Sequence, residues 1–308
     1  MAAIRRILCP VDFSDVSVRC VAHAAALAKW RGAHLTVLHV ESPVLQRLPG
    51  VPAGLEENEA HASDLERIRR HVGELFDAAG LPMGGADLLV DLGRPAPHIL
   101  DRACSLAADV IVLGSHGHGG FERLMLGSVA ERVLRRAPCD VLVVPPHAVA
   151  PTRLPYGSIV CGVDFSPSSE RALDVAAALA VDAGASLSAV HVIGWPWDES
   201  GAPAFDGVTL EQARALEAYK RSLEVGAVGR LETLLAALPA LPARRTPIVR
   251  HGRSHREILQ VARERDADLI VLGVQGRGAV DLALFGSTAS QVVRGAACPV
   301  WIARLSRS

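Results

Sequence analysis

The stretch that decides the fold is Cys9-Pro-Val-Asp12-Phe-Ser14, because it returns 152 residues later as Cys161-Gly-Val-Asp164-Phe-Ser166. The dipeptide His39-Val40 returns as His191-Val192 at the same spacing. A repeat of about 150 residues is too long for a solenoid of short units and indicates a duplicated domain.

The second copy is longer than the first in its middle part. Gly93-Arg94 returns as Gly252-Arg253, and Gly127-Ser128 returns as Gly286-Ser287, each 159 residues later. The second copy therefore has seven extra residues between its second and third predicted strands.

The length and composition allow two domains of ordinary size. The chain has 308 residues, of which 50% are apolar, and this is enough for a core in each copy. We expect one domain over residues 1–147, a second over 156–308, and a linker over 148–155, which contains two prolines and has no periodic pattern.

Strand-like and helix-like segments alternate within each copy. Apolar, β-branched runs predict strands, and alanine-rich or mixed polar and apolar stretches predict the helices between them. In the first copy the predicted strands are 4–13, 35–40, 86–92, 110–114 and 141–144, and the predicted helices are 17–31, 56–79, 96–107 and 128–137. The second copy repeats this order, with its long helix near 209–238. We therefore expect an α/β protein of two tandem Rossmann-like domains, each a five-stranded parallel sheet with helices on both faces.

Charge and cysteine usage exclude several classes of protein. The formal net charge is −1 and Lys29 and Lys220 are the only lysines, so no basic surface for nucleic acid is expected. The apolar run near the N-terminus is too short for a signal peptide, and no stretch approaches the roughly 18 apolar residues of a membrane span. The six cysteines show no CxxC spacing and are expected to be free thiols in a reducing compartment. These features predict a cytoplasmic protein with neither nucleic acid nor membrane as a partner.

A glycine-rich loop follows the fourth predicted strand of each copy. The first copy reads Gly114-Ser-His-Gly117, then nine residues and Gly127-Ser128. The second copy reads Gly273-Val-Gln-Gly276, then nine residues and Gly286-Ser287. Glycines let the backbone approach a ligand closely, and the exposed amides and the next helix N-terminus can hold phosphate oxygens. The loop is neither a Walker A motif, which ends in Gly-Lys-Ser/Thr, nor a dinucleotide fingerprint, which follows the first strand.

Phosphate charge at such a loop needs counter-charges. Backbone amides and the helix dipole supply part of them, and the further candidates are a divalent cation such as Mg²⁺, Arg123 and Arg277. Ligands of parallel sheets bind beyond the carboxyl ends of the strands, so the residues that follow Val11, Val40 and Leu113 should converge.

The pattern G-x2-G-x9-G-[ST], with an aspartate closing the first strand, resembles the ATP-binding motif of universal stress proteins. It occurs once in each half, so the chain is similar to a tandem-type universal stress protein with adenine nucleotide alpha-hydrolase-like domains. The resemblance implies ATP or another adenine nucleotide as the ligand, with Mg²⁺ as a candidate companion. One departure is Val274-Gln275, which stands where the first half has Ser115-His116.

The resemblance also implies which residues bind the nucleotide. It assigns the adenine to Asp12 and Val40 in the first half, and to Asp164 and Val192 in the second. It assigns the ribose and phosphates to Gly114, Gly117, Gly127, Ser128 and Val129 in the first half, and to Gly273, Gly276, Gly286, Ser287 and Thr288 in the second.

These residues also have structural interpretations. Ser128 with Glu131 fits the S-x-x-E capping box, so Ser128 could simply begin its helix. The loop glycines could shape an empty turn, and the two aspartates could cap the helices that follow them. His39 and His191 end matching strands and are interpreted as core or crevice residues. No set of histidines has a third ligand nearby, so no metal site is predicted.

The repeated motif favours a nucleotide-responsive stress-response module without dedicated chemistry. No Ser-His-Asp arrangement can be placed at the crevice from spacing and no G-x-S-x-G elbow occurs, so no catalytic residue is assigned. The alternatives are a slow ATPase of the same fold and a nucleotide-free interaction scaffold. The resemblance further implies that the last strands of the two domains, 141–144 and 300–303, pair as an intramolecular pseudo-dimer, and a homodimer of two chains stays open.

Overall fold

The computed structural model describes residues 4–41, 57–79, 85–115, 126–146, 148, 154–194, 209–238, 244–276 and 285–305, with side chains in the second of these ranges from residue 66 onward. The described chain forms two compact units. The first unit is the N-terminal repeat together with the C-terminal segment that begins at Ala296, and the second unit runs from Pro155 to Gly295.

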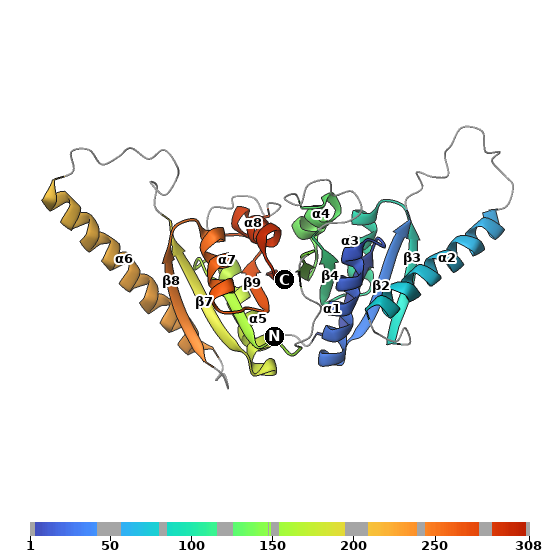
Figure 1. Ribbon diagram of the computed structural model, residues 1–308, viewed down its shortest axis with the longest axis horizontal. Coiled ribbons are helices and arrows are strands. Elements are labelled where there is room, and N and C mark those ends of the chain that lie inside the picture. Colours follow the sequence, from blue (N-terminus) through green and yellow to red (C-terminus); the bar gives the residue numbers. More distant parts are fainter. Residues whose placement is uncertain are drawn as a thin grey trace. The chain divides into compact units, whose positions relative to one another are not determined.

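The first unit alternates strands and helices as expected (Figure 1). Its elements are β1 (Arg6–Val11), α1 (Asp15–Arg31), β2 (His34–Glu41), α2 (Glu57–Ala78), β3 (Ala86–Leu92), α3 (Pro95–Ser105), β4 (Val110–Gly114), α4 (Ser128–Arg136), β5 (Asp140–Val144) and β10 (Val300–Ala303). The sheet has the order β3-β2-β1-β4-β5, and all of these neighbours are parallel. Right-handed crossovers then put α1 and α2 on one face and α3 and α4 on the other, and each pair is in contact.

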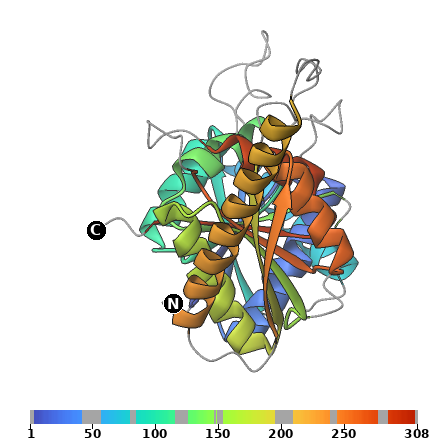
Figure 2. The ribbon, with the colours of Figure 1, turned by 90° about the vertical axis from the view of Figure 1, so that its left-hand side faces the viewer.

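The second unit repeats this order. Its elements are β6 (Ser158–Gly162), α5 (Pro167–Ala183), β7 (Ser186–Ile193), α6 (Leu210–Ala237), β8 (Arg245–His251), α7 (Ser254–Glu264), β9 (Leu269–Gly273) and α8 (Ser287–Gly295). The parallel strands lie in the order β8-β7-β6-β9. The long helix α6 packs on β7 and β8, and Figure 2 shows it lying across the strands of this unit. The predicted fold of two α/β domains with parallel sheets is confirmed.

The central strands are buried on both faces, which explains their continuous apolar sequences. The four residues of β4 from Val110 to Leu113 are all buried, and so is β9 from Leu269 to Leu272. Strand β1 ends at Val11, earlier than the predicted limit of residue 13, because Phe13 has a φ of 61°, which extended backbone does not allow.

The C-terminal strand β10 belongs to the first unit, where it pairs antiparallel with β5. Trp301 is fully buried, and its Nε1 donates to Asp140 Oδ2 at 3.0 Å. The Arg304 amide donates to Asp140 Oδ1 at 2.9 Å, and its guanidinium donates to the carbonyl oxygens of Leu134 and Arg135 at the end of α4. The expected pairing of the two last strands within one chain is confirmed.

Burial also raises the pKa of the thiols that lie in the core. Cys9 and Cys161 lie within the central strands, and Cys20 is buried in α1. Burial raises the pKa of the Cys9 thiol to about 12 and raises the pKa of Cys161 further. Among the described helices, none is long and apolar enough to cross a membrane.

Candidate functional site

A cavity of about 540 Å³ lies at the carboxyl ends of β6, β7 and β9 in the second unit. Strand β6 has β7 on one side and β9 on the other, so the strand order reverses at this point. Ligands of open α/β sheets bind at such a switch point. All the residues that the sequence predicted for a ligand site in the second half line this cavity, namely Asp164, Val192, Gly273, Gly276, Gly286, Ser287 and Thr288.

Three helices begin at the cavity. Ser169 in the first turn of α5, Ser254 at the start of α7 and Ser287 at the start of α8 all line it. A helix N-terminus exposes unpaired amides and carries about half a positive charge, although at α5 a capping box is formed by Ser166 and the Ser169 hydroxyl donates to Ser166 O at 3.0 Å. This part of the cavity therefore suits an anionic group.

Asp164 is held by the N-terminus of α5. Its Oδ1 accepts from the amide of Ser166 at 3.0 Å and from the Ser166 hydroxyl at 2.6 Å. Its own amide donates to Ser169 Oγ at 3.2 Å. The second carboxylate oxygen faces the glycine-rich loop, since a β-carbon on Gly276 would lie 2.6 Å from Asp164 Oδ2. The carboxylate is thus aimed across the site toward the loop.

The first unit repeats this arrangement around Asp12. Its Oδ1 accepts from the Ser14 amide at 3.1 Å, from the Ser14 hydroxyl at 2.6 Å and from the Ser17 hydroxyl at 2.8 Å. Val40 is buried in β2, next to the end of β1. The interpretation of the two aspartates as helix caps is wrong, because the cap positions belong to Ser14 and Ser166 and each aspartate forms the turn before the cap.

In each glycine-rich loop, one backbone hydrogen bond joins the residue after the strand to the glycine before the next helix. The Gly127 amide donates to Ser115 O at 2.8 Å, and the Gly286 amide donates to Val274 O at 3.0 Å. Gly114 is the last residue of β4. Gly117, Arg123 and Arg277 lie outside the described residues.

The capping box predicted at Ser128 is not formed. Gly127 occupies the N-cap position of α4, Ser128 is the first helical residue and Val129 is the second. The Glu131 carboxylate instead accepts from Arg135 one turn further along, at 2.6 Å. A serine inside the helix cannot accept the amide that an N-cap serine would bind.

Two glycines of the second loop have different reasons to be glycine. A β-carbon on Gly273 would lie 2.6 to 2.7 Å from Ser168, including its backbone carbon and oxygen. Gly273 therefore permits close packing of β9 against the start of α5. Gly276 faces the Asp164 side chain instead, so its lack of a β-carbon leaves room for that carboxylate.

Sequence reasoning missed several lining residues. Ser169 could have been found, since the spacing from Asp164 to Ser169 repeats that from Asp12 to Ser17. Ser254 gave no such signal, because the first copy has a proline at the matching position.

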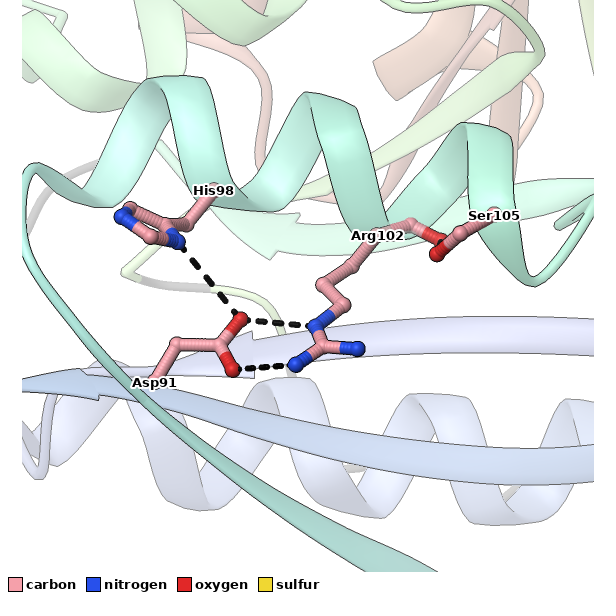
Figure 3. Close-up of polar contacts among 4 residues, drawn as sticks. All are labelled: Asp91, His98, Arg102 and Ser105. Carbon is pink, nitrogen blue, oxygen red and sulfur yellow. Dashed lines mark hydrogen bonds and ion pairs between the residues drawn. The ribbon is translucent and has the colours of Figure 1, made fainter.

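A second polar cluster joins β3 to α3 in the first unit (Figure 3). The Asp91 carboxylate is 9% exposed and accepts from Arg102 Nε at 2.8 Å and from Nη2 at 2.5 Å, with His98 Nδ1 at 3.7 Å. The bond from Arg102 lowers the pKa of Asp91. The Ser105 hydroxyl donates to the Arg102 carbonyl at 3.2 Å, along its own helix. This cluster ties a strand to a helix and is not arranged as a Ser-His-Asp relay.

Comparison with known proteins identifies the class of protein that this fold and cavity define. The model of the universal stress protein family matches residues 3–145 and again residues 155–304. The chain belongs to the universal stress protein family and carries two of its domains in tandem.

Relatives and solved structures agree with this assignment. A universal stress protein of Mycolicibacterium smegmatis is 31% identical over 313 residues, which cover 97% of this chain and 96% of that protein. Universal stress protein Rv2005c of Mycobacterium tuberculosis is 29% identical over 302 residues, with 96% of each chain covered. A universal stress protein structure from Archaeoglobus fulgidus shares the fold, with a TM-score of 0.62 at 24% identity over 97% of this chain and 96% of that one.

Proposed function

We propose that this protein binds an adenine nucleotide in each unit, with ATP as the first candidate, and acts as a nucleotide-responsive stress-response module in the cytoplasm. One observation carries the proposal. The cavity of the second unit is lined by every residue of that half that matches the family's ATP-binding motif. The six cysteines are free, which supports a reducing compartment.

The residues around the cavity fit such a ligand. The volume of about 540 Å³ lies within the range of roughly 300–1,000 Å³ typical of small-molecule sites. Leu272 and Ile258 offer apolar surface for a base, near Asp164 and Val192. Gly286 and the α8 N-terminus would hold phosphates. Mg²⁺ would accompany those phosphates, because it keeps several waters and needs few protein ligands.

The lining offers little for catalysis. Among the described lining residues only Asp164 carries a carboxylate and only His191 an imidazole, and both make hydrogen bonds within the fold. We therefore assign no catalytic residue, and the proposal is binding rather than ATP hydrolysis.

The proposal is tested by calorimetric titration of the full chain with ATP and Mg²⁺. Gly276→Ala would place a methyl group 2.6 Å from Asp164 Oδ2 and displace that carboxylate. We expect affinity at the second-unit site to fall about tenfold, the cost of one lost hydrogen bond to a charged group. Gly226→Ala is the matched control, since its β-carbon would meet open space on α6. A folded wild-type chain that binds no nucleotide would contradict the proposal and leave the scaffold alternative.

A further inference from the structure

The aspartate of each site is followed by a phenylalanine with an unfavourable backbone. Phe13 has a φ of 61° and Phe165 a φ of 62°, in the left-handed region that bulky residues seldom occupy. Such a conformation persists only where the surrounding contacts enforce it, and it is common beside ligand sites. Its presence at matching positions of both copies calls for a shared cause.

In the second unit, side chains from a strand and from a helix contact the phenylalanine ring. The Phe165 and His191 rings have centroids 4.5 Å apart and are inclined by 40°. The Arg230 guanidinium carbon lies 4.1 Å from the Phe165 centroid, as a cation–π contact from α6. His191 is itself fixed, since its Nδ1 is 2.7 Å from Val163 O, one residue before Asp164.

The first unit has the same three-part arrangement. The Phe13 centroid lies 4.3 Å from that of His39 and 5.2 Å from that of His71. His39 Nδ1 is 3.0 Å from Val11 O. His71 lies on α2 at the position that corresponds to Arg230 on α6, 159 residues later. The histidine from the strand is thus retained, and the contact from the long helix changes from imidazole to guanidinium.

We propose that Phe13 and Phe165 are positioning residues of the two nucleotide sites. Contacts from the strand histidine and from the long helix hold the phenylalanine in its left-handed conformation, and this conformation directs the preceding aspartate toward the ligand. Among the described residues, Asp164 and His191 line the cavity whereas Phe165 does not, so Phe165 acts through its neighbours. This inference rests on the proposed nucleotide binding and names the residues that organise it.

Calorimetric titration of full-length variants with ATP and Mg²⁺ tests the inference. Phe165→Ala should weaken the second-unit site about tenfold, because the left-handed conformation loses the contacts that enforce it. The first-unit site should keep its affinity. Phe13→Ala is the matched variant and should show the reverse pattern. Phe165→Tyr, which keeps the ring, should recover most of the lost affinity.

A second variant separates positioning from simple packing. The Arg230 side chain comes from an exposed position of α6, so Arg230→Ala should leave the unfolding midpoint close to that of wild type. It should still weaken the second-unit site about threefold, since a cation–π contact at an exposed position has roughly that effect on an equilibrium. Arg230→Lys should restore the affinity.

The outcomes distinguish this inference from the proposed function. If wild type binds two nucleotides and both Phe165→Ala and Arg230→Ala bind with wild-type affinity, positioning by Phe165 is overturned and nucleotide binding stands. If folded wild type binds no nucleotide, the proposed function fails and the positioning role fails with it. If Phe165→Ala does not fold, the test rests on the affinity of Arg230→Ala and on whether Arg230→Lys restores it. Wild-type affinity in Arg230→Ala would then overturn the positioning role.

Discussion

The two copies of the domain agree closely around the aspartate and phenylalanine that follow the first strand, and they differ at a junction between a strand and a helix. Phe13 and Phe165 have φ values of 61° and 62°, and each ring contacts a strand histidine. By contrast, the ion pair between strand and helix has its charges exchanged: the strand supplies the acidic residue in the first unit and the basic residue in the second. In the first unit Asp91 on β3 binds Arg102 on α3, whereas in the second unit Arg250 on β8 binds Glu264 on α7.

The difference shows which physical requirements each position must meet. Phe13 and Phe165 share a left-handed backbone and a ring contact with a strand histidine, and both the phenylalanine and the aspartate before it recur in the two copies. A strand–helix tie needs only opposite charges within reach, so either partner can supply either sign. The variants below test whether the shared features and the reversed pair have these different roles.

The largest effect on stability is expected at Gly273, which lines the cavity and also packs against the start of α5. A β-carbon on Gly273 would lie 2.7 Å from backbone atoms of Ser168, which cannot move without shifting α5. We expect Gly273→Ala to lower the free energy of unfolding by about 1–3 kcal/mol, the usual cost of overpacking. Urea unfolding followed by circular dichroism measures it. Gly276→Ala, which meets only a carboxylate, is the control, and equal losses in the two variants would refute the distinction.

The reversed ion pairs should contribute unequally to stability. Arg102→Ala leaves the Asp91 carboxylate, which is 9% exposed, without its bidentate partner, and we expect a loss of about 1–3 kcal/mol. Arg250→Ala should cost less, since both partners of that pair are more than one-third exposed and solvent screens them. Urea unfolding of the two variants measures the difference, and a larger loss in Arg250→Ala would contradict it.

The pH dependence of stability is the control for the Arg102→Ala prediction, because it reports whether the Asp91 carboxylate is ionised. The Arg102 side chain lowers the pKa of Asp91 in the folded state below the unfolded value of about 3.9. The pair therefore stabilises the fold fully above about pH 4, and its contribution is lost as the pH falls through the folded pKa. The gap in stability between wild type and Arg102→Ala should narrow in that acid range. A gap that stays constant there would rule out the ionised pair as its cause.

A smaller difference between the copies concerns their thiols. Cys104 is exposed on α3, and the second copy has arginine at the matching position. Burial raises the pKa of Cys9 to about 12 and raises that of Cys161 further, so neither thiol should ionise near neutral pH. Because Cys104 is exposed, labelling of folded protein with a thiol reagent should show a fast phase that Cys104→Ser removes. Persistence of that phase would place the reactive thiol elsewhere.

Much of the fold could be predicted because the strands are buried, apolar and bounded by turn residues. Residues 86–92 and 110–114 were predicted as strands, and these are the limits of β3 and β4. The convergence of second-half residues on one cavity was predictable too, since the carboxyl ends of parallel strands meet at one edge of the sheet.

The remaining features depend on contacts that local patterns do not report. A serine three residues before a glutamate fits both an N-cap and a first helical position. The capping-box interpretation took Ser128 as the N-cap, whereas the N-cap is Gly127 and Ser128 is the first helical residue. The ring of Phe165 contacts side chains from β7 and α6, which lie far from it in sequence. The bond from Trp301 to Asp140 joins residues 161 positions apart.

The central claim is that each copy holds one nucleotide, and binding stoichiometry tests it most directly. Gly286 lines the cavity and its β-carbon would already lie 3.3 Å from Val274 O, so a valine there should block close approach of phosphate. Calorimetry with ATP and Mg²⁺ should give two sites for wild type and one site for each of Gly127→Val and Gly286→Val. No binding by folded wild type, or two sites retained in both variants, would contradict the duplicated site.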